Sequence, residues 1–94
     1  MDIDYLKTFI VVAQEESFSL AAEKLHLTQP AISKRVSALE DRLNTKLLDR
    51  LSKRIELTPA GEELLPKARA IVSNFDDMLH TAASKAVDIK GELR

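Results

Sequence analysis

The strongest constraint on the fold is an apolar repeat in the last third of the chain. Four residues follow one another at intervals of seven, and smaller or aromatic residues lie between them: Leu65, Val72, Leu79 and Ala86, with Ala68, Phe75 and Ala82 in between. After Thr58, a natural N-cap, this spacing predicts one helix from Pro59 to about Lys85 or beyond, roughly 40 Å long at about 1.5 Å per residue. The chain has only 94 residues, so the rest of it is too small to cover the whole stripe.

An uncovered apolar stripe predicts a partner helix, most simply the same helix of a second copy. The residues expected to form this homodimer contact are Leu65, Ala68, Val72, Phe75, Leu79 and Ala82. The alternative is a helix that folds back on its own domain.

The preceding residues predict three shorter helices. The stripe formed by Leu6, Phe9, Ile10 and Ala13 indicates a helix over residues 3–15. Ser19 is a natural N-cap for a second helix over residues 20–25, and Thr28 caps a third. Proline is tolerated in a first helical turn, which suits Pro30.

The third helix carries one apolar stripe along its length, formed by Ile32, Val36, Leu39 and Leu43. We expect this stripe to face the core throughout. The second and third helices, separated by residues 26–28, form a helix-turn-helix unit.

After residue 45 the apolar period becomes that of extended chain. Residues 48–54 alternate in character, and Ile55-Glu56-Leu57 reads apolar, polar, apolar. A small two-stranded hairpin is expected here, with its tip near residues 51–53. Strands this short must pack on the helices.

Composition excludes most enzyme classes and gives no sign of a cofactor or metal. The chain has no cysteine, and its two histidines, His26 and His80, show no ligand spacing. Two glycines are too few for a phosphate-binding loop. No apolar run reaches the length of a membrane span and no secretion signal precedes the first helix, so we expect a cytoplasmic protein with no membrane contact.

The net charge of −1 conceals a basic middle segment. Residues 28–58 carry seven basic and four acidic side chains, whereas residues 1–27 carry two basic and five acidic ones. A local basic surface suits a phosphate backbone. A merely solvated charged face is the alternative.

The exposed side of the third helix has the chemistry that base edges and phosphates require. The residues expected to bind DNA here are Thr28, Gln29, Pro30, Ser33, Lys34 and Ser37. Gln29 can pair with adenine, and Lys34 can reach guanine or phosphate. Asp41 on the same side would repel phosphate, which confines groove entry to the first two turns. A polar solvated face is again the alternative.

Three basic residues lie on or beside the expected hairpin: Arg50, Lys53 and Arg54. Such cations suit the minor groove or its phosphates. Arg50 has two other potential partners, because the acidic side chains of Glu40 and Asp49 could pair with it in a structural role.

Together these residues resemble the N-terminal part of a LysR-type transcriptional regulator over residues 1 to about 88. The matching segments are Ser17 to Leu25, Thr28 to Ser33, Leu39 to Leu43, Arg50, and Leu57 to Gly61. Three positions depart from the residues usual in this family: Asn44 replaces glycine, Leu48 replaces phenylalanine and Lys53 replaces arginine. The departure at Lys53 leaves open whether it or Arg54 enters the minor groove.

The resemblance implies a mainly α fold, a winged helix-turn-helix followed by a long linker helix that dimerises. It divides the chain into a DNA-binding domain (1–58), a dimerisation helix (59–88) and the start of a hinge (89–94). In that family, residues matching Gln29, Pro30, Ser33 and Lys34 meet the major groove, and the one matching Lys53 approaches the minor groove. Members also carry an effector domain, absent here, that binds a small-molecule inducer, and the intact protein is often a tetramer.

The leading hypothesis is therefore sequence-specific binding of double-stranded DNA by a homodimer. The alternative is a protein-interaction adaptor whose long helix docks on a partner and whose basic middle segment is incidental, because winged helices also serve that role. An adaptor would show an exposed apolar patch where this chain has polar side chains. A third option, a small hydrolase, fails because the sequence shows neither a nucleophile–base pair nor a set of metal ligands.

Overall fold

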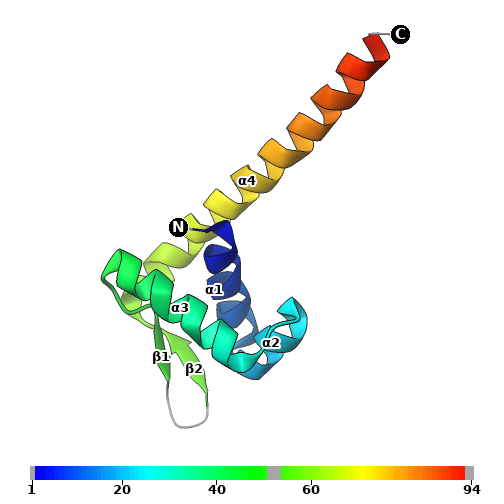
Figure 1. The fold of residues 1–94 in the computed structure, drawn as a ribbon. Helices are drawn as coiled ribbons and strands as arrows, with labels where there is room; N and C mark the ends of the chain where they lie inside the picture. The colour runs from blue at the N-terminus through cyan, green and yellow to red at the C-terminus, as the bar shows by residue number, and fades with distance from the viewer. Residues whose placement is uncertain (1, 51–53, 93–94) are drawn as a thin grey trace.

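The chain runs through three helices, a two-stranded hairpin and one long helix (Figure 1). The computed structural model describes residues 2–50 and 54–92, with side chains described up to residue 86. The elements are α1 (Ile3–Glu15), α2 (Phe18–Leu25), α3 (Gln29–Leu43), β1 (Leu48–Arg50), β2 (Ile55–Leu57) and α4 (Pro59–Glu92). This order confirms the predicted mainly α fold class, a winged helix-turn-helix followed by a long helix.

Capping residues fix both ends of α3. The backbone of Thr28 is extended, and its hydroxyl oxygen accepts a hydrogen bond of 3.2 Å from the N–H of Ala31, as the sequence predicts. Asn44 ends the helix in the left-handed conformation with φ of 52°, which asparagine tolerates. These caps determine where the helix starts and stops.

The start of α2 differs from the prediction. Ser17, rather than Ser19, caps this helix, and its hydroxyl oxygen accepts a hydrogen bond of 3.1 Å from the N–H of Leu20. The cause is the short connection after α1, because Glu16 ends that helix in the left-handed conformation and Ser17 is already extended. The helix therefore begins at Phe18, which packs against the core.

One hydrophobic core joins the first three helices, the hairpin and the start of α4. Its buried members are Phe9, Val12, Ala21, Ala22, Ile32, Val36, Leu39, Leu47, Leu48, Ile55 and Ala68. The stripe predicted for α1 includes Phe9 but misses Val12 and Thr8, which are both fully buried. Thr8 is compatible with burial because its hydroxyl donates to the carbonyl oxygen of Asp4 at 2.8 Å.

Leu43, the last residue of the stripe predicted for α3, does not belong to this core. Its exposed fraction is 43%, because it lies a turn beyond Leu39 at the very end of the helix. With Leu6 and Ile71 it lines an apolar hollow of about 90 Å³ between α1, α3 and α4. The expectation that the stripe faces the core throughout is therefore wrong at Leu43.

The predicted hairpin is confirmed. The strands β1 and β2 pair antiparallel, with Leu48 opposite Leu57 and Arg50 opposite Ile55. Leu48 and Ile55 turn into the core, which anchors the short strands on the helices. The predicted tip, residues 51–53, lies outside the described residues.

Two residues hold the start of α4 against the segment before β1. The hydroxyl of Thr58 donates to the carbonyl oxygen of Lys46 at 2.6 Å and accepts from the N–H of Gly61 at 2.9 Å. A Cβ on Gly61 would overlap the carbonyl oxygen of Leu47. Glycine is therefore the residue that lets the first turn of α4 lie this close to the neighbouring backbone.

The rest of α4 continues through Pro66 and projects from the body of the molecule (Figure 1). The described molecule measures 62 × 25 × 19 Å, an elongation that comes from this helix. About halfway along α4, Asp76 forms an ion pair of 3.8 Å with Lys7 of α1. The predicted helix from Pro59 to Lys85 or beyond is confirmed.

Candidate nucleic-acid interface

The first half of α3 presents one polar side to solvent. Gln29, Pro30, Lys34 and Ser37 are exposed, and Ser33 is half-buried beside them. The opposite side of the helix is in the core, which fixes the direction in which this polar side faces. Amide, hydroxyl and ammonium groups on one exposed surface can pair with base edges and phosphates.

The N-terminal end of α3 adds an anion-binding feature. Residues 26–28 connect α2 to α3, so the start of α3 lies at the turn of the helix-turn-helix unit. Thr28 is exposed there, and because its oxygen accepts from the Ala31 N–H, its own proton can still be donated. Helix N-termini favour phosphate.

Arg50, at the end of β1, lies beside this polar side of α3. Its Nη2 donates a hydrogen bond of 2.6 Å to the hydroxyl oxygen of Ser33. Its guanidinium carbon lies 4.4 Å from the centre of the Phe18 ring on α2, within the range of a cation–π contact. The structure therefore joins one predicted wing residue to one predicted residue of α3.

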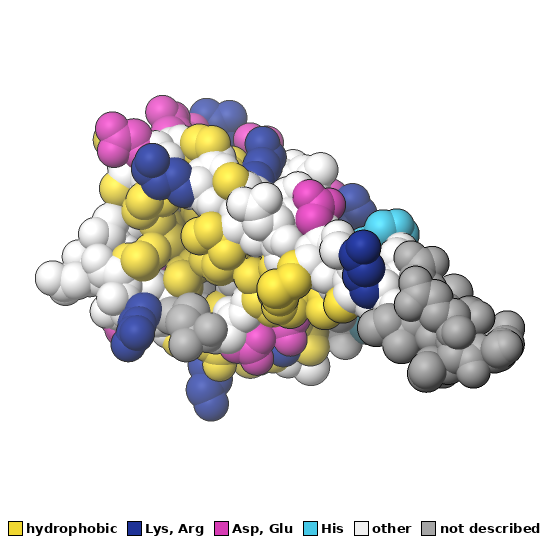
Figure 2. Space-filling view, turned by 90° about the horizontal axis from the view of Figure 1, so that it is seen from above, with side chains coloured by type: hydrophobic (Ala, Val, Ile, Leu, Met, Phe, Trp, Pro, Cys, Tyr) yellow, Lys and Arg dark blue, Asp and Glu magenta, His cyan; other side chains and the backbone are white. Residues whose placement is uncertain are grey.

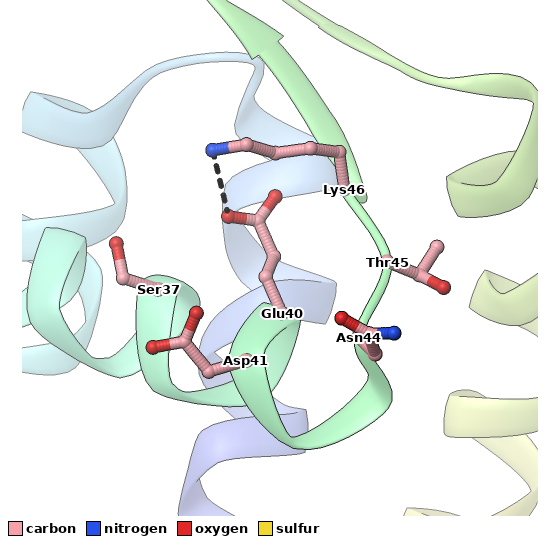
Figure 3. A pocket seen from close by; sticks show the side chains of 6 residues that line it. All are labelled: Ser37, Glu40, Asp41, Asn44, Thr45 and Lys46. Carbon is pink, nitrogen blue, oxygen red and sulfur yellow. Dashed lines mark ion pairs between the residues drawn. The ribbon is translucent and has the colours of Figure 1, made fainter.

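Neither of the acidic partners considered for Arg50 pairs with it among the described residues. Glu40 points instead toward Lys46, whose Nζ lies 3.6 Å from its Oε1 (Figure 3). Its other oxygen accepts hydrogen bonds from the backbone N–H groups of Leu47 and Leu48 at 2.8 and 3.3 Å. Glu40 is thus a buried anchor for the chain that enters β1.

The C-terminal part of α3 exposes one carboxylate, that of Asp41, on the same side as Ser37. Asp41 and Ser37 line a hollow of about 340 Å³ together with Glu40 and the residues that follow the helix (Figure 3). The exposed carboxylate of Asp41 repels phosphate. On this side of the helix, the part without an exposed carboxylate is therefore the first two turns of α3.

The other wing cations have different positions. Arg54 precedes β2, is exposed, and forms an ion pair of 2.9 Å with Glu56 on the same strand. Because both side chains are largely exposed, the pair contributes little stability and does not prevent Arg54 from binding another anion. Lys53 lies outside the described residues.

The residues predicted to dimerise fall into two groups along α4. Ala68 is buried in the core of its own chain, and Leu65 is half-buried against that core. Val72 and Phe75 are half-buried, whereas Leu79 and Ala82 are exposed. Two exposed residues that were not predicted, Ile71 and Met78, widen this apolar face. Figure 2 shows hydrophobic side chains gathered over the middle of the molecule.

Sequence reasoning did not identify Phe18 or Arg35 as partners in charged contacts. The contact of Phe18 with Arg50 depends on tertiary structure. Arg35 lies 5.7 Å from the Tyr5 ring centre and donates to the hydroxyl of Thr8 at 3.4 Å. No local sequence spacing predicts either contact, because the two partners lie on separate helices or strands.

The described residues contain no group of three or more acidic or histidine side chains that could hold a metal ion. Within residues 2–50 and 54–92, no helix is both long enough and apolar enough to cross a membrane.

Comparison with known proteins decides the family. The family model for bacterial regulatory helix-turn-helix proteins of the lysR family matches residues 3–62. The chain belongs to the lysR family. A lysR-family domain of this kind is the sequence-specific DNA-binding part of a transcription regulator.

Curated relatives extend the similarity beyond the matched segment. The chain is 47% identical over 93 residues to an uncharacterized HTH-type transcriptional regulator in the ibpB-leuC intergenic region of Azotobacter vinelandii, covering 99% of this chain and 65% of that protein. It is also 47% identical over 75 residues to the regulator HdfR of Yersinia enterocolitica, covering 80% of this chain and 26% of HdfR. This lysR-family chain thus spans about a quarter to two thirds of these relatives.

Solved structures agree with this membership. The DNA-binding domain of BenM in complex with catB site 1 DNA superposes with a TM-score of 0.87 at 35% identity, covering 92% of this chain and 97% of that one. Vibrio fischeri DarR in complex with DNA gives a TM-score of 0.87 at 37% identity, covering 92% of this chain and 30% of DarR. The lysR-family fold therefore extends over α1 to α4.

Proposed function

We propose that this lysR-family chain binds a specific duplex sequence as a homodimer, with α3 in the major groove and the hairpin wing at the minor groove. Residues 1–58 act as the DNA-binding domain, residues 59–88 as the dimerisation helix and residues 89–94 as the start of a hinge. The observation that carries this proposal is the polar side of α3 beside the basic wing.

The major-groove contacts come from the first two turns of α3. Gln29 is exposed at the first helical position, from which its amide can pair with adenine. Lys34 follows more than a turn later on the exposed side and reaches guanine or phosphate. Thr28 and Ser37 border this region and suit phosphate contacts, because short hydroxyl groups do not obstruct the backbone.

The wing cations supply the minor-groove contacts. Arg54 is exposed, and its exposed partner Glu56 leaves it available to phosphate or to the groove. Lys53 is the other candidate, and either of the two can enter the groove. Arg50 differs from both, because its guanidinium already contacts Ser33 and Phe18.

Dimerisation uses the apolar face of α4 beyond the core. Large exposed apolar groups such as Leu79 are costly to leave in water, so a second copy of the same face is the simplest cover. Such a dimer presents two copies of α3 to two half-sites, whose centres are spaced by one helical turn of DNA, about 34–36 Å, or by a multiple of it.

The properties of the intact protein are an extension of this proposal. Because the chain spans only part of its relatives, inducer binding belongs to an effector domain outside residues 1–94, and a tetramer is the expected assembly of the whole regulator. Its role is regulatory rather than catalytic, and its place of action is the cytoplasm, where bacterial DNA lies.

The adaptor hypothesis has weaker support. An adaptor surface on α3 would expose large apolar side chains. The large exposed apolar residues of the described chain are Leu20, Leu43, Ile71, Met78 and Leu79, and none of them lies in the first half of α3. That region carries polar side chains instead.

Selection from a pool of random duplexes, repeated across a salt series, tests the proposal. We expect enrichment of a two-fold-symmetric motif and a linear fall of log K with log salt. Binding without a motif would contradict specific reading by this chain, and no binding at any salt would favour the adaptor.

A further inference from the structure

The contact of Arg50 with Ser33 crosses from the wing to the DNA-facing side of α3. Arg50 ends β1, Ser33 lies in the second turn of α3, and Phe18 begins α2, so one guanidinium touches three elements. The 2.6 Å distance from Nη2 to the Ser33 oxygen is short for a hydrogen bond from nitrogen. The Phe18 ring covers the guanidinium at 4.4 Å and so restricts its orientation.

A second pair in the same chain provides an internal comparison. Arg35 also lies over an aromatic ring, that of Tyr5, and also donates to a hydroxyl, that of Thr8. Thr8, however, donates its own proton to the carbonyl oxygen of Asp4 at 2.8 Å, so both functions of that hydroxyl are used inside the protein.

Among the described residues, the hydroxyl of Ser33 uses only one of its two hydrogen-bonding functions. It accepts from Arg50, and among the described residues nothing accepts its proton. A hydroxyl has one proton to donate, and a charged donor on its oxygen polarises the O–H bond. Ser33 is half-buried beside exposed Lys34 and Ser37, so a partner for this proton can approach only from the open side.

We infer that Arg50 is a positioning residue that makes Ser33 a dedicated hydrogen-bond donor to an acceptor on a base edge in the major groove. The acceptors of this chemistry are N7 of a purine, O6 of guanine and O4 of thymine. The inference rests on the proposed function and adds a specificity determinant to it. Arg50 then affects base preference through Ser33, without itself carrying a phosphate contact.

The test uses the duplex that the wild-type chain selects, together with a set in which each base pair is changed in turn. The variants are Ser33→Ala, Arg50→Met, the double variant and Arg35→Met. The last is the matched control, because it removes the same charge and the same kind of ring contact on the α1 side of α3.

Ser33→Ala and Arg50→Met should weaken discrimination at the same base pair, each by about threefold to tenfold, the range of one hydrogen bond. The double variant should lose no more than either single variant, because both remove the same contact. Arg35→Met should leave the preference at that base pair unchanged. The salt slope of Arg50→Met should equal that of the wild type, since no phosphate contact is lost.

An unchanged preference in Arg50→Met, or additive effects in the double variant, would overturn the inference. So would a salt slope reduced by about one unit, because that marks a direct phosphate contact. If Arg50→Met melts early, Arg50→Lys replaces it. Lysine keeps the charge but lacks the planar fork, so base preference should still fall. Failure of the wild type to select any motif would contradict the proposed function itself, a distinct result.

Discussion

The side-chain carboxylate of Glu40 accepts a hydrogen bond of 2.8 Å from the backbone N–H of Leu47, which is fully buried. The same oxygen accepts from the N–H of Leu48, so α3 holds the chain that enters the wing. Glu40→Ala leaves these groups without a partner and should lower the free energy of unfolding by about 1–3 kcal/mol. Chemical denaturation measures the loss.

Two further variants separate the hydrogen bonds from the charge. Glu40→Gln keeps an oxygen acceptor and loses only the ion pair to exposed Lys46, so it should retain most of the stability. Asp41→Ala removes a neighbouring exposed carboxylate and should stay within about 0.5 kcal/mol of the wild type. Equal losses in Glu40→Ala and Asp41→Ala would show that the buried hydrogen bonds contribute nothing.

The sequence predicts the elements well where local chemistry decides. Thr28 caps α3 because its hydroxyl needs only the N–H of a residue three positions later. The same rule predicts the wrong cap for α2. Ser17 and Ser19 lie two positions apart, and the end of α1 determines which of them is extended. Leu43 shows the corresponding limit of periodicity, since a stripe does not reveal where the neighbouring helices stop.

The candidate interface also contains features that the local sequence predicts and features that only the tertiary structure determines. Exposure of Lys34 and Ser37 follows from the angle of each residue to the core stripe, and exposure of Gln29 follows from its place at the N-terminal tip of α3. The partner of Arg50 could not be predicted, because Glu40 and Asp49 are nearer in sequence than Ser33 and their charge is opposite. The choice is tertiary, since Glu40 is already occupied by backbone N–H groups.

Gly61→Ala tests the close approach of α4 to the backbone before β1. Inside an ordinary helix this substitution stabilises by up to about 1 kcal/mol. Here the added Cβ meets the carbonyl oxygen of Leu47 and lies 3.1 Å from a methyl carbon of Leu57, so we expect destabilisation of about 1–3 kcal/mol or more. A lower melting temperature of Gly61→Ala would support the close approach, and a higher one would contradict it. Ala70→Gly, on an exposed turn of α4, gives the scale of helix propensity alone.

Gln29→Ala tests the major-groove assignment. We expect a loss of about 1–3 kcal/mol on the selected duplex, confined to one base pair whose preference is relaxed, because one amide contact disappears. Quantitative binding to duplexes changed one pair at a time measures this. Gln14→Ala, an exposed glutamine on α1, is the matched control and should bind every duplex as the wild type does. Uniform weakening across all sequences in Gln29→Ala would contradict base reading.

Leu79→Glu tests whether the apolar face of α4 joins two copies. Leu79 is 52% exposed in the single chain, so the variant should fold normally while its dimer loses two buried leucines and gains two facing charges. At roughly 1.5–3 kcal/mol per leucine, the dimer dissociation constant should rise about 100-fold or more. Sedimentation equilibrium measures this shift. Thr81→Glu adds the same charge on the other side of the helix and should remain dimeric. A monomeric wild type, or an unshifted Leu79→Glu, would show that this face does not dimerise.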